Sequence, residues 1–208
     1  MKIEIKHRWN ASILFAANIP DETAPQFRIR AALRMAVKSG SDLRGSDLRG
    51  SDLSGSNLSG SNLSESNLRG SDLRGSNLSG SDLSGSNLSE SNLTPIRDDL
   101  WAVLSAVPNE ADGLLAALIA GRIDGSTYEG KCACLVGTIA SLRKENYQKL
   151  DGLKPNSSRP IERFFLSINL GDTPTTNQFS KIAAEWIGEW LVNMRSAFGV
   201  KISTTSEL

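Results

Sequence analysis

The sequence predicts a repeat coil placed between an N-terminal β-hairpin with a helix and a mainly α-helical C-terminal region. The first observation is a five-residue word that runs from Ser41 to Pro95 without a break. The second is strand-like alternation near the N-terminus, and the third is apolar spacing of three and four residues after Pro95. These observations predict three segments: residues 1–40, 41–95 and 96–208.

A period of five fits neither an ordinary helix nor an ordinary strand. Each helical residue turns by about 100°, so five residues rotate successive leucines by about 140° and spread them around the helix. On a strand, successive leucines would point to opposite faces because five is odd. A flexible linker is the alternative for Ser/Gly-rich sequence, but a linker has no reason to place Leu at every fifth position. The segment therefore predicts a coil that turns a corner once per word, with Gly relaxing the backbone at each corner.

The leucine of each word is the predicted core of the coil. Each of the eleven words reads Ser, then Asp or Asn, Leu, a residue that is Ser, Arg or Thr, and usually Gly. We expect the leucines to face the axis: Leu43, Leu48, Leu53, Leu58, Leu63, Leu68, Leu73, Leu78, Leu83, Leu88 and Leu93. The residue after each leucine, such as Ser64, is expected to face outward.

Words of this form resemble the pentapeptide-repeat family, whose consensus is Ala, Asp or Asn, Leu and two variable residues. The resemblance covers about a quarter of the chain and implies a right-handed quadrilateral β-helix of about three turns, with four words per turn. It also implies that the residue two before each leucine faces inward. That residue is Ser in all eleven words, so its hydroxyl needs a partner, because an unpaired buried hydroxyl costs about 1–3 kcal/mol.

The charges of the predicted coil bear on one function known in this family. Some members resemble DNA in shape and charge and protect or inhibit DNA gyrase, which needs a long acidic rod. Here residues 20 apart are expected to stack, and the only directly stacked acids are Asp52 and Asp72. The tube is short and its charges are mixed, so the sequence argues against DNA mimicry by the repeats alone. A DNA-mimic-type modulator of gyrase or of an anti-phage nuclease stays as an alternative.

The N-terminal segment predicts a cap for the coil. Residues 1–19 alternate and read as a short hairpin. One face of its first strand carries Ile3, Ile5, His7 and Trp9. A start cluster at 21–25 and three alanines favour a helix over residues 27–37, although the same residues also alternate as in a strand. We expect this helix to lie across the mouth of the coil.

The C-terminal segment predicts five helices. Thr94 is expected to be the N-cap of the first, with Pro95 at the first helical position. The helices are expected at 96–107, 109–121, 131–144, 159–168 and 176–198. The last helix carries the candidate interface: Phe179, Ile182, Trp186, Trp190 and Met194. This stripe is either the core of the helical domain or a surface that binds another protein, since Trp is common at contact hot spots.

No catalytic, cofactor-binding or metal site is predicted. His7 is interpreted as a packed residue of the hairpin. Cys132 and Cys134 form a C-x-C pair that lacks the further ligands zinc requires, so core packing is the interpretation. Tyr128–Lys131 gathers polar groups near a turn and reads as an exposed loop. A small-molecule binder or enzyme with its site in the helical domain stays as an alternative.

The overall charge argues against direct nucleic-acid binding, because it balances at 23 basic and 23 acidic residues. The N-terminus lacks an apolar signal core, and no run of about 20 apolar residues exists, so we expect a cytoplasmic chain with no membrane contact.

The layout of cap, short coil and helical domain is similar to pentapeptide-repeat proteins of phages and prophages. We therefore predict a non-catalytic protein-interaction module that forms a homodimer and binds a host protein. Inhibition of that host protein is one form that this function could take. The partner itself is not predicted.

Overall fold

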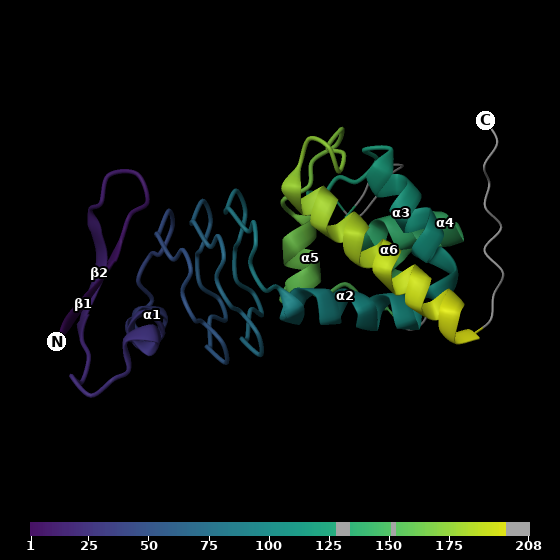
Figure 1. Ribbon diagram of the computed structural model, residues 1–208. Helices are drawn as coiled ribbons and strands as arrows, with labels where there is room; N and C mark the ends of the chain where they lie inside the picture. The colour runs from purple at the N-terminus through teal and green to yellow at the C-terminus, as the bar shows by residue number, and fades with distance from the viewer. Residues whose placement is uncertain (128–133, 151–152, 199–208) are drawn as a thin grey trace.

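A computed structural model describes residues 1–127, 134–150 and 153–198 (Figure 1). Figure 1 shows three parts in a row: an N-terminal hairpin with one helix, the repeat coil, and the remaining helices beyond the coil. The three parts follow one another along the molecule in the order of the sequence.

The predicted N-terminal hairpin is confirmed. Strand β1 (Lys2–Lys6) pairs antiparallel with β2 (Ile13–Asn18), and the register shifts between Ile5 and Lys6. The expected inward face does not extend to Trp9, which is 65% exposed. This part of the prediction is wrong because the strand ends at Lys6 and the chain then turns, so the alternation stops.

The helix predicted after the hairpin is also confirmed, and the strand alternative is wrong. Helix α1 (Arg28–Lys38) follows a 3-10 turn, η1 (Pro25–Phe27), and contacts both strands of the hairpin. The residues that it buries are Ala32, Leu33 and Ala36. The helix ends just before Gly40, whose φ of +69° lies in the left-handed region that glycine adopts readily.

The repeat segment is a β-helix in which residues 20 apart lie on adjacent turns. Parallel bridges connect Asp47 with Asn67, Asp52 with Asp72, Asn57 with Asn77, Asn62 with Asp82, Asn67 with Asn87, and Asp72 with Asn92. All eleven leucines are between 0% and 6% exposed. The right hand and the quadrilateral cross-section stay predictions from the family resemblance.

Most of the inward serines donate a hydrogen bond from the hydroxyl to a backbone carbonyl. The hydroxyl of Ser61 donates to the Leu58 carbonyl at 2.6 Å, and that of Ser76 donates to the carbonyl of Leu73 at 2.7 Å. Ser71 is equally buried, but its hydroxyl has no hydrogen-bond partner among the described residues, and the same holds for Ser56. The coil therefore contains inward serines of both kinds at equivalent positions.

This difference gives a matched pair of substitutions. Ser71→Ala is expected to raise the free energy of unfolding by about 1–3 kcal/mol, because it removes an unsatisfied buried hydroxyl. Ser76→Ala is expected to lower it by about 1 kcal/mol, because it removes a made hydrogen bond. Urea unfolding followed by circular dichroism measures both, and a destabilised Ser71→Ala would contradict the expectation.

The five predicted helices are confirmed, most of them shorter than expected. They are α2 (Thr94–Ala106), α3 (Ala111–Ile119) after the 3-10 turn η2 (Pro108–Glu110), α4 (Leu135–Arg143), α5 (Pro160–Phe165) after the 3-10 turn η3 (Tyr147–Lys149), and α6 (Gln178–Phe198). Residues 131–133 of the third predicted helix lie outside the described residues.

The predicted N-cap of α2 is wrong by one residue. Thr94 is the first helical residue, Leu93 holds the cap position, and no side chain caps the helix. The hydroxyl and the N–H of Thr94 both donate to Oδ1 of Asn92. The reason is that the last word keeps the turn of the coil, in which an Asp or Asn oxygen accepts from the residue two positions later.

Within the described ranges, no single helix has both the length and the apolar character needed to cross a bilayer. Helix α2 and the segment Pro108–Ile119 meet these criteria only as a pair, and the chain bends by 104° between them.

Candidate functional site

The N-terminal edge of the coil is covered by the hairpin. The N–H of Asp47 donates to the Lys6 carbonyl at 2.8 Å, and the N–H of Arg8 donates to the Gly45 carbonyl at 2.7 Å. His7 is half-buried at this junction, and a Cβ added to Gly45 would lie 2.5 Å from its Nε2. His7 therefore packs against the backbone of the first turn.

The other edge of the coil is covered by a side chain of α6. Within the coil, a leucine N–H donates to the next turn, as Leu48 does to the Asn67 carbonyl at 2.9 Å. After the last turn, Gln178 supplies the missing groups: its Oε1 accepts from the Leu88 N–H at 3.3 Å, and its Nε2 donates to the Ser86 carbonyl. One side-chain amide thus makes the two hydrogen bonds that the N–H and C=O of one residue in a further turn would make.

Two further contacts cover the same edge. The N–H of Gly80 donates to the Ser158 carbonyl at 2.9 Å, and Nε of Arg163 donates to the Ser81 carbonyl at 3.3 Å. Because an open strand edge pairs readily with other chains, these contacts limit end-to-end association. Sequence reasoning missed Gln178, Ser158 and Arg163, since no local pattern distinguishes them from ordinary surface residues.

Two arginines of the coil neutralise acids in their own words. Arg49 lies 2.7 Å from Asp47, and Arg74 lies 2.6 Å from Asp72. The hydrogen bonds from these guanidinium groups hold the pKa of each carboxyl below its usual value. The two directly stacked acids each have an arginine nearby: Arg74 binds Asp72, and Arg30 lies 3.6 Å from Asp52.

The other two arginines pair with acids of the next turn. Arg44 contacts Glu65, and Arg69 contacts Glu90 at 2.8 Å. Both glutamates occupy corners with φ of +56° and +60°, a conformation that costs a non-glycine residue roughly 1–2 kcal/mol. An exposed ion pair contributes only about 0–1 kcal/mol. The two ion pairs therefore neutralise charge on the wall of the coil. Their stabilisation is smaller than the free-energy cost of the left-handed backbone at the two glutamates.

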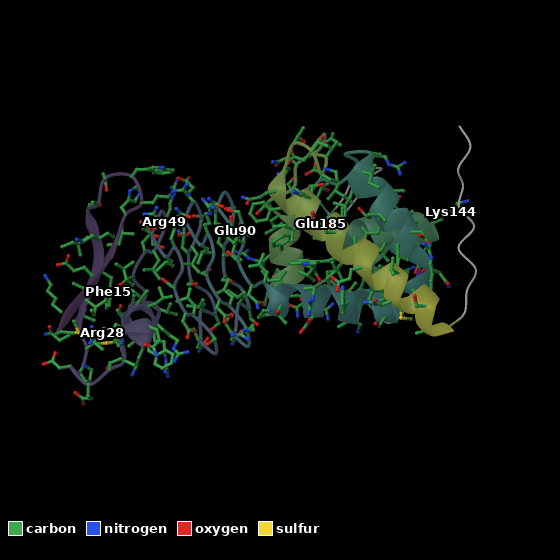
Figure 2. The ribbon with its side chains drawn as sticks, viewed as in Figure 1. Phe15, Arg28, Arg49, Glu90, Lys144 and Glu185 are labelled. Carbon is green, nitrogen blue, oxygen red and sulfur yellow. The ribbon has the colours of Figure 1, made fainter. Side chains whose placement is uncertain are left out.

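The charged side chains of the coil lie at its periphery. Figure 2 shows Arg49 and Glu90 on the outside of the coil, where their side chains are 63% and 65% exposed. All four coil arginines are paired with coil acids, and Arg30 lies near Asp52, so only Asp42 and Asp82 among the seven coil acids have no ion-pair partner in the described residues.

The candidate interface on α6 is largely covered by the helical domain. Phe179 and Trp190 are 3% and 5% exposed, and the other three residues (Ile182, Trp186 and Met194) are partly buried against the core. Three helices, α2, α3 and α5, contact α6, so they cover a wider part of this stripe than one neighbouring helix would. The two buried residues are core positions.

A cleft lies between the last turn of the coil and α6. It has a volume of about 360 Å³, and its lining includes Glu90, Lys181, Ile182 and Trp186. Lys181 lies 4.0 Å from Glu185, and Glu90 is paired as described above. A ligand in this cleft would therefore meet the half-buried side chain of Trp186. The charged residues beside it, Glu90 and Lys181, already have ion-pair partners.

A larger groove lies at the other end of the molecule, beside α1. It has a volume of about 660 Å³ and is bounded by the residues after β2, by α1 and by the coil. Arg34, Met35 and Lys38 line it and are exposed. Sequence reasoning missed this groove, although the three- and four-residue spacing of these residues on the side of α1 away from its apolar face was a usable signal.

The candidates considered for catalysis do not form a reactive group in the described chain. Cys134 is buried, and desolvation raises the pKa of its thiol, so it stays protonated at neutral pH. Cys132 and Tyr128–Lys131 lie outside the described residues. Among the residues that the structure describes, no three His, Cys, Asp or Glu side chains gather as a metal site would require.

The repeated word, the buried leucines and the 20-residue bridges define a β-helical repeat protein. The family model for pentapeptide repeats matches eight copies of its unit, over residues 39–75 and 56–94. The segment of residues 39–94 thus consists of pentapeptide repeats. No curated protein and no solved structure matches the chain.

Proposed function

We propose that this chain is a non-catalytic interaction module that binds a host protein. Pentapeptide repeats commonly mediate protein–protein interactions, and the family is generally non-enzymatic. The observation that carries the proposal is that the chain's own elements cover both ends of the coil, through Lys6 and Arg8 at one end and Gln178 at the other. The coil then acts as a rigid spacer, a right-handed quadrilateral β-helix that holds two surfaces apart.

The two surfaces are the groove beside α1 and the cleft beside α6. We propose further that the protein is of phage or prophage origin, that it acts in the cytoplasm, and that binding inhibits the host protein. The half-buried Trp186 and the 55% exposed Val192 leave part of α6 uncovered. This open part supports a homodimer, in which a second copy covers it.

The DNA-mimic alternative loses support from the charge pairing of the coil. A DNA mimic presents unpaired negative charge along a rod, whereas each coil arginine here neutralises an acid of the coil. The interaction-module proposal needs no such charge. We therefore favour a partner that is recognised by side-chain chemistry at the ends of the coil.

Light scattering and affinity capture test this function. We expect the full chain to be a dimer at micromolar concentration and to retain a specific protein from host lysate. Trp186→Ala, which changes the open side of α6, is expected to weaken capture or dimerisation at least about tenfold, because Trp is a frequent hot-spot residue. Ser79→Ala, an exposed position on the coil, serves as the control.

Circular dichroism establishes that both variants remain folded. A monomer that captures the same proteins with or without Trp186→Ala would contradict both the homodimer and the role of α6.

A further inference from the structure

One face of α1 is left open by the rest of the described chain. The opposite face is fully buried, with Ala32, Leu33 and Ala36 each 0% exposed. The open face repeats at intervals of three and four residues and carries Ala31, Arg34, Met35 and Lys38, all of which line the groove. Met35 is 47% exposed, so a large apolar side chain lies at the centre of this face.

The other sides of the groove are formed by residues that follow β2 and by residues of the coil. Ile19 and Pro20, directly after β2, form one wall, and Asn57 and Ser59 of the coil form another. Ile19 is buried, and its N–H donates to the Met1 carbonyl at 2.8 Å. The floor therefore combines apolar side chains with polar groups that are held in place by the hairpin and the coil.

The basic residues at this groove differ from those around them. Residues 1–40 contain seven Lys and Arg side chains. Five of these have an acidic or carbonyl partner: Lys2, Lys6, Arg8, Arg28 and Arg30. The other two, Arg34 and Lys38, have no hydrogen-bond or ion-pair partner anywhere in the described part of the chain. They are four residues apart on one helix face, where like charges repel.

We propose that the α1 groove, defined by Ile19, Ala31, Arg34, Met35 and Lys38, binds an extended segment of a partner protein in which two carboxylates flank an apolar residue. Side chains two apart on an extended segment share one face at a spacing of roughly 6.6 Å. This matches the roughly 5–6 Å between Cβ atoms four apart on a helix, so the carboxylates meet Arg34 and Lys38.

The apolar residue between the carboxylates points to the opposite face of the segment, away from α1 and toward the wall formed by Ile19 and Pro20. Met35 lies between Arg34 and Lys38 on the face of α1, where its flexible thioether packs against the backbone and the side-chain methylenes of the segment. The proposal rests on the proposed function and specifies the chemistry of its partner: an acidic and apolar peptide segment.

Fluorescence anisotropy with the full chain tests this site. The probe is a fluorescein-labelled peptide, Gly-Asp-Leu-Asp-Gly, and its control is Gly-Asn-Leu-Asn-Gly. The acidic peptide is expected to bind, and to bind more weakly at high salt because exposed charges are screened. The amide control is expected to bind at least about tenfold more weakly, since it lacks both charge-assisted contacts.

Variants of the protein locate the binding. Arg34→Glu combined with Lys38→Glu is expected to weaken the acidic peptide at least about tenfold by charge repulsion. Met35→Ser is expected to weaken both peptides. The matched control is Arg122→Glu with Lys154→Glu, which makes the same charge change at exposed residues of the helical domain and should leave the affinity unchanged. If the reversed pair unfolds, Arg34→Gln with Lys38→Gln replaces it.

Several outcomes would overturn the site. One is an acidic peptide that fails to bind, and another is equal affinity for the wild type and the Arg34 and Lys38 variants. A dimer that dissociates in the reversed variant would mean that a second copy occupies the groove. A DNA duplex that binds at these residues in place of the peptide would also contradict the proposal.

The two proposals fail separately. A captured host protein that depends on Trp186 but not on Arg34 and Lys38 would remove the groove and leave the interaction module standing. Peptide binding without any captured host protein would leave the groove as a peptide site and remove the proposed function.

Discussion

A fragment of residues 41–95 is expected not to fold on its own. It loses the backbone contacts of Asp47 with Lys6 and of Gly80 with Ser158, together with the amide of Gln178. Both ends of the coil then expose unpaired N–H and C=O groups, which favour aggregation. Repeat proteins in general need capping elements at their ends.

Circular dichroism with thermal melting, combined with light scattering, measures this expectation. The full chain is the control and is expected to show a cooperative transition. A soluble monomeric fragment with its own cooperative transition would show that the covering elements are dispensable.

The second large effect is expected at the centre of the coil. Leu68 is 0% exposed, and its N–H donates to the Asn87 carbonyl at 2.9 Å. Leu68→Ala is expected to lower the free energy of unfolding by about 2–5 kcal/mol, because it removes buried methyl groups and leaves a cavity in the axis. Urea denaturation gives this value directly.

The control for Leu68→Ala has to be an exposed position. Ser64 was expected to face outward, but it is only 9% exposed and its hydroxyl donates to Oδ1 of Asn62. Ser79 occupies the equivalent place in another word and is exposed. Ser79→Ala is therefore expected to change stability by less than about 0.5 kcal/mol, and equal losses for Leu68→Ala and Ser79→Ala would contradict the inward assignment.

The parts of the fold that depend on a period could be predicted from the sequence. Leucine at every fifth residue requires a corner in each word, and apolar residues at intervals of three and four residues indicate helices. The contacts that join these parts could not be predicted in this way. Gln178 covers the coil only because the chain folds back after α5, and such a long-range contact leaves no local pattern.

The errors at element ends have a similar physical origin. Trp9 continues the alternation of β1 in the sequence, yet the chain turns after Lys6 and exposes it. Thr94 has the composition of an N-cap, yet Asn92 of the last word binds its hydroxyl first. For the candidate site, Phe179 and Trp190 carried a correct helical period, but a period alone does not tell how many helices pack against that face.

The 20-residue turn has a consequence for how such a protein changes its length. Deleting or duplicating 20 residues would move the two ends by about 4.8 Å along the axis and leave each capping contact on the same wall. Deleting a single word would instead rotate one end by a quarter of a turn, so that Gln178 would face the wrong carbonyl. Relatives that keep this architecture are therefore expected to differ in length by whole turns, and the distance between their two ends varies in fixed increments.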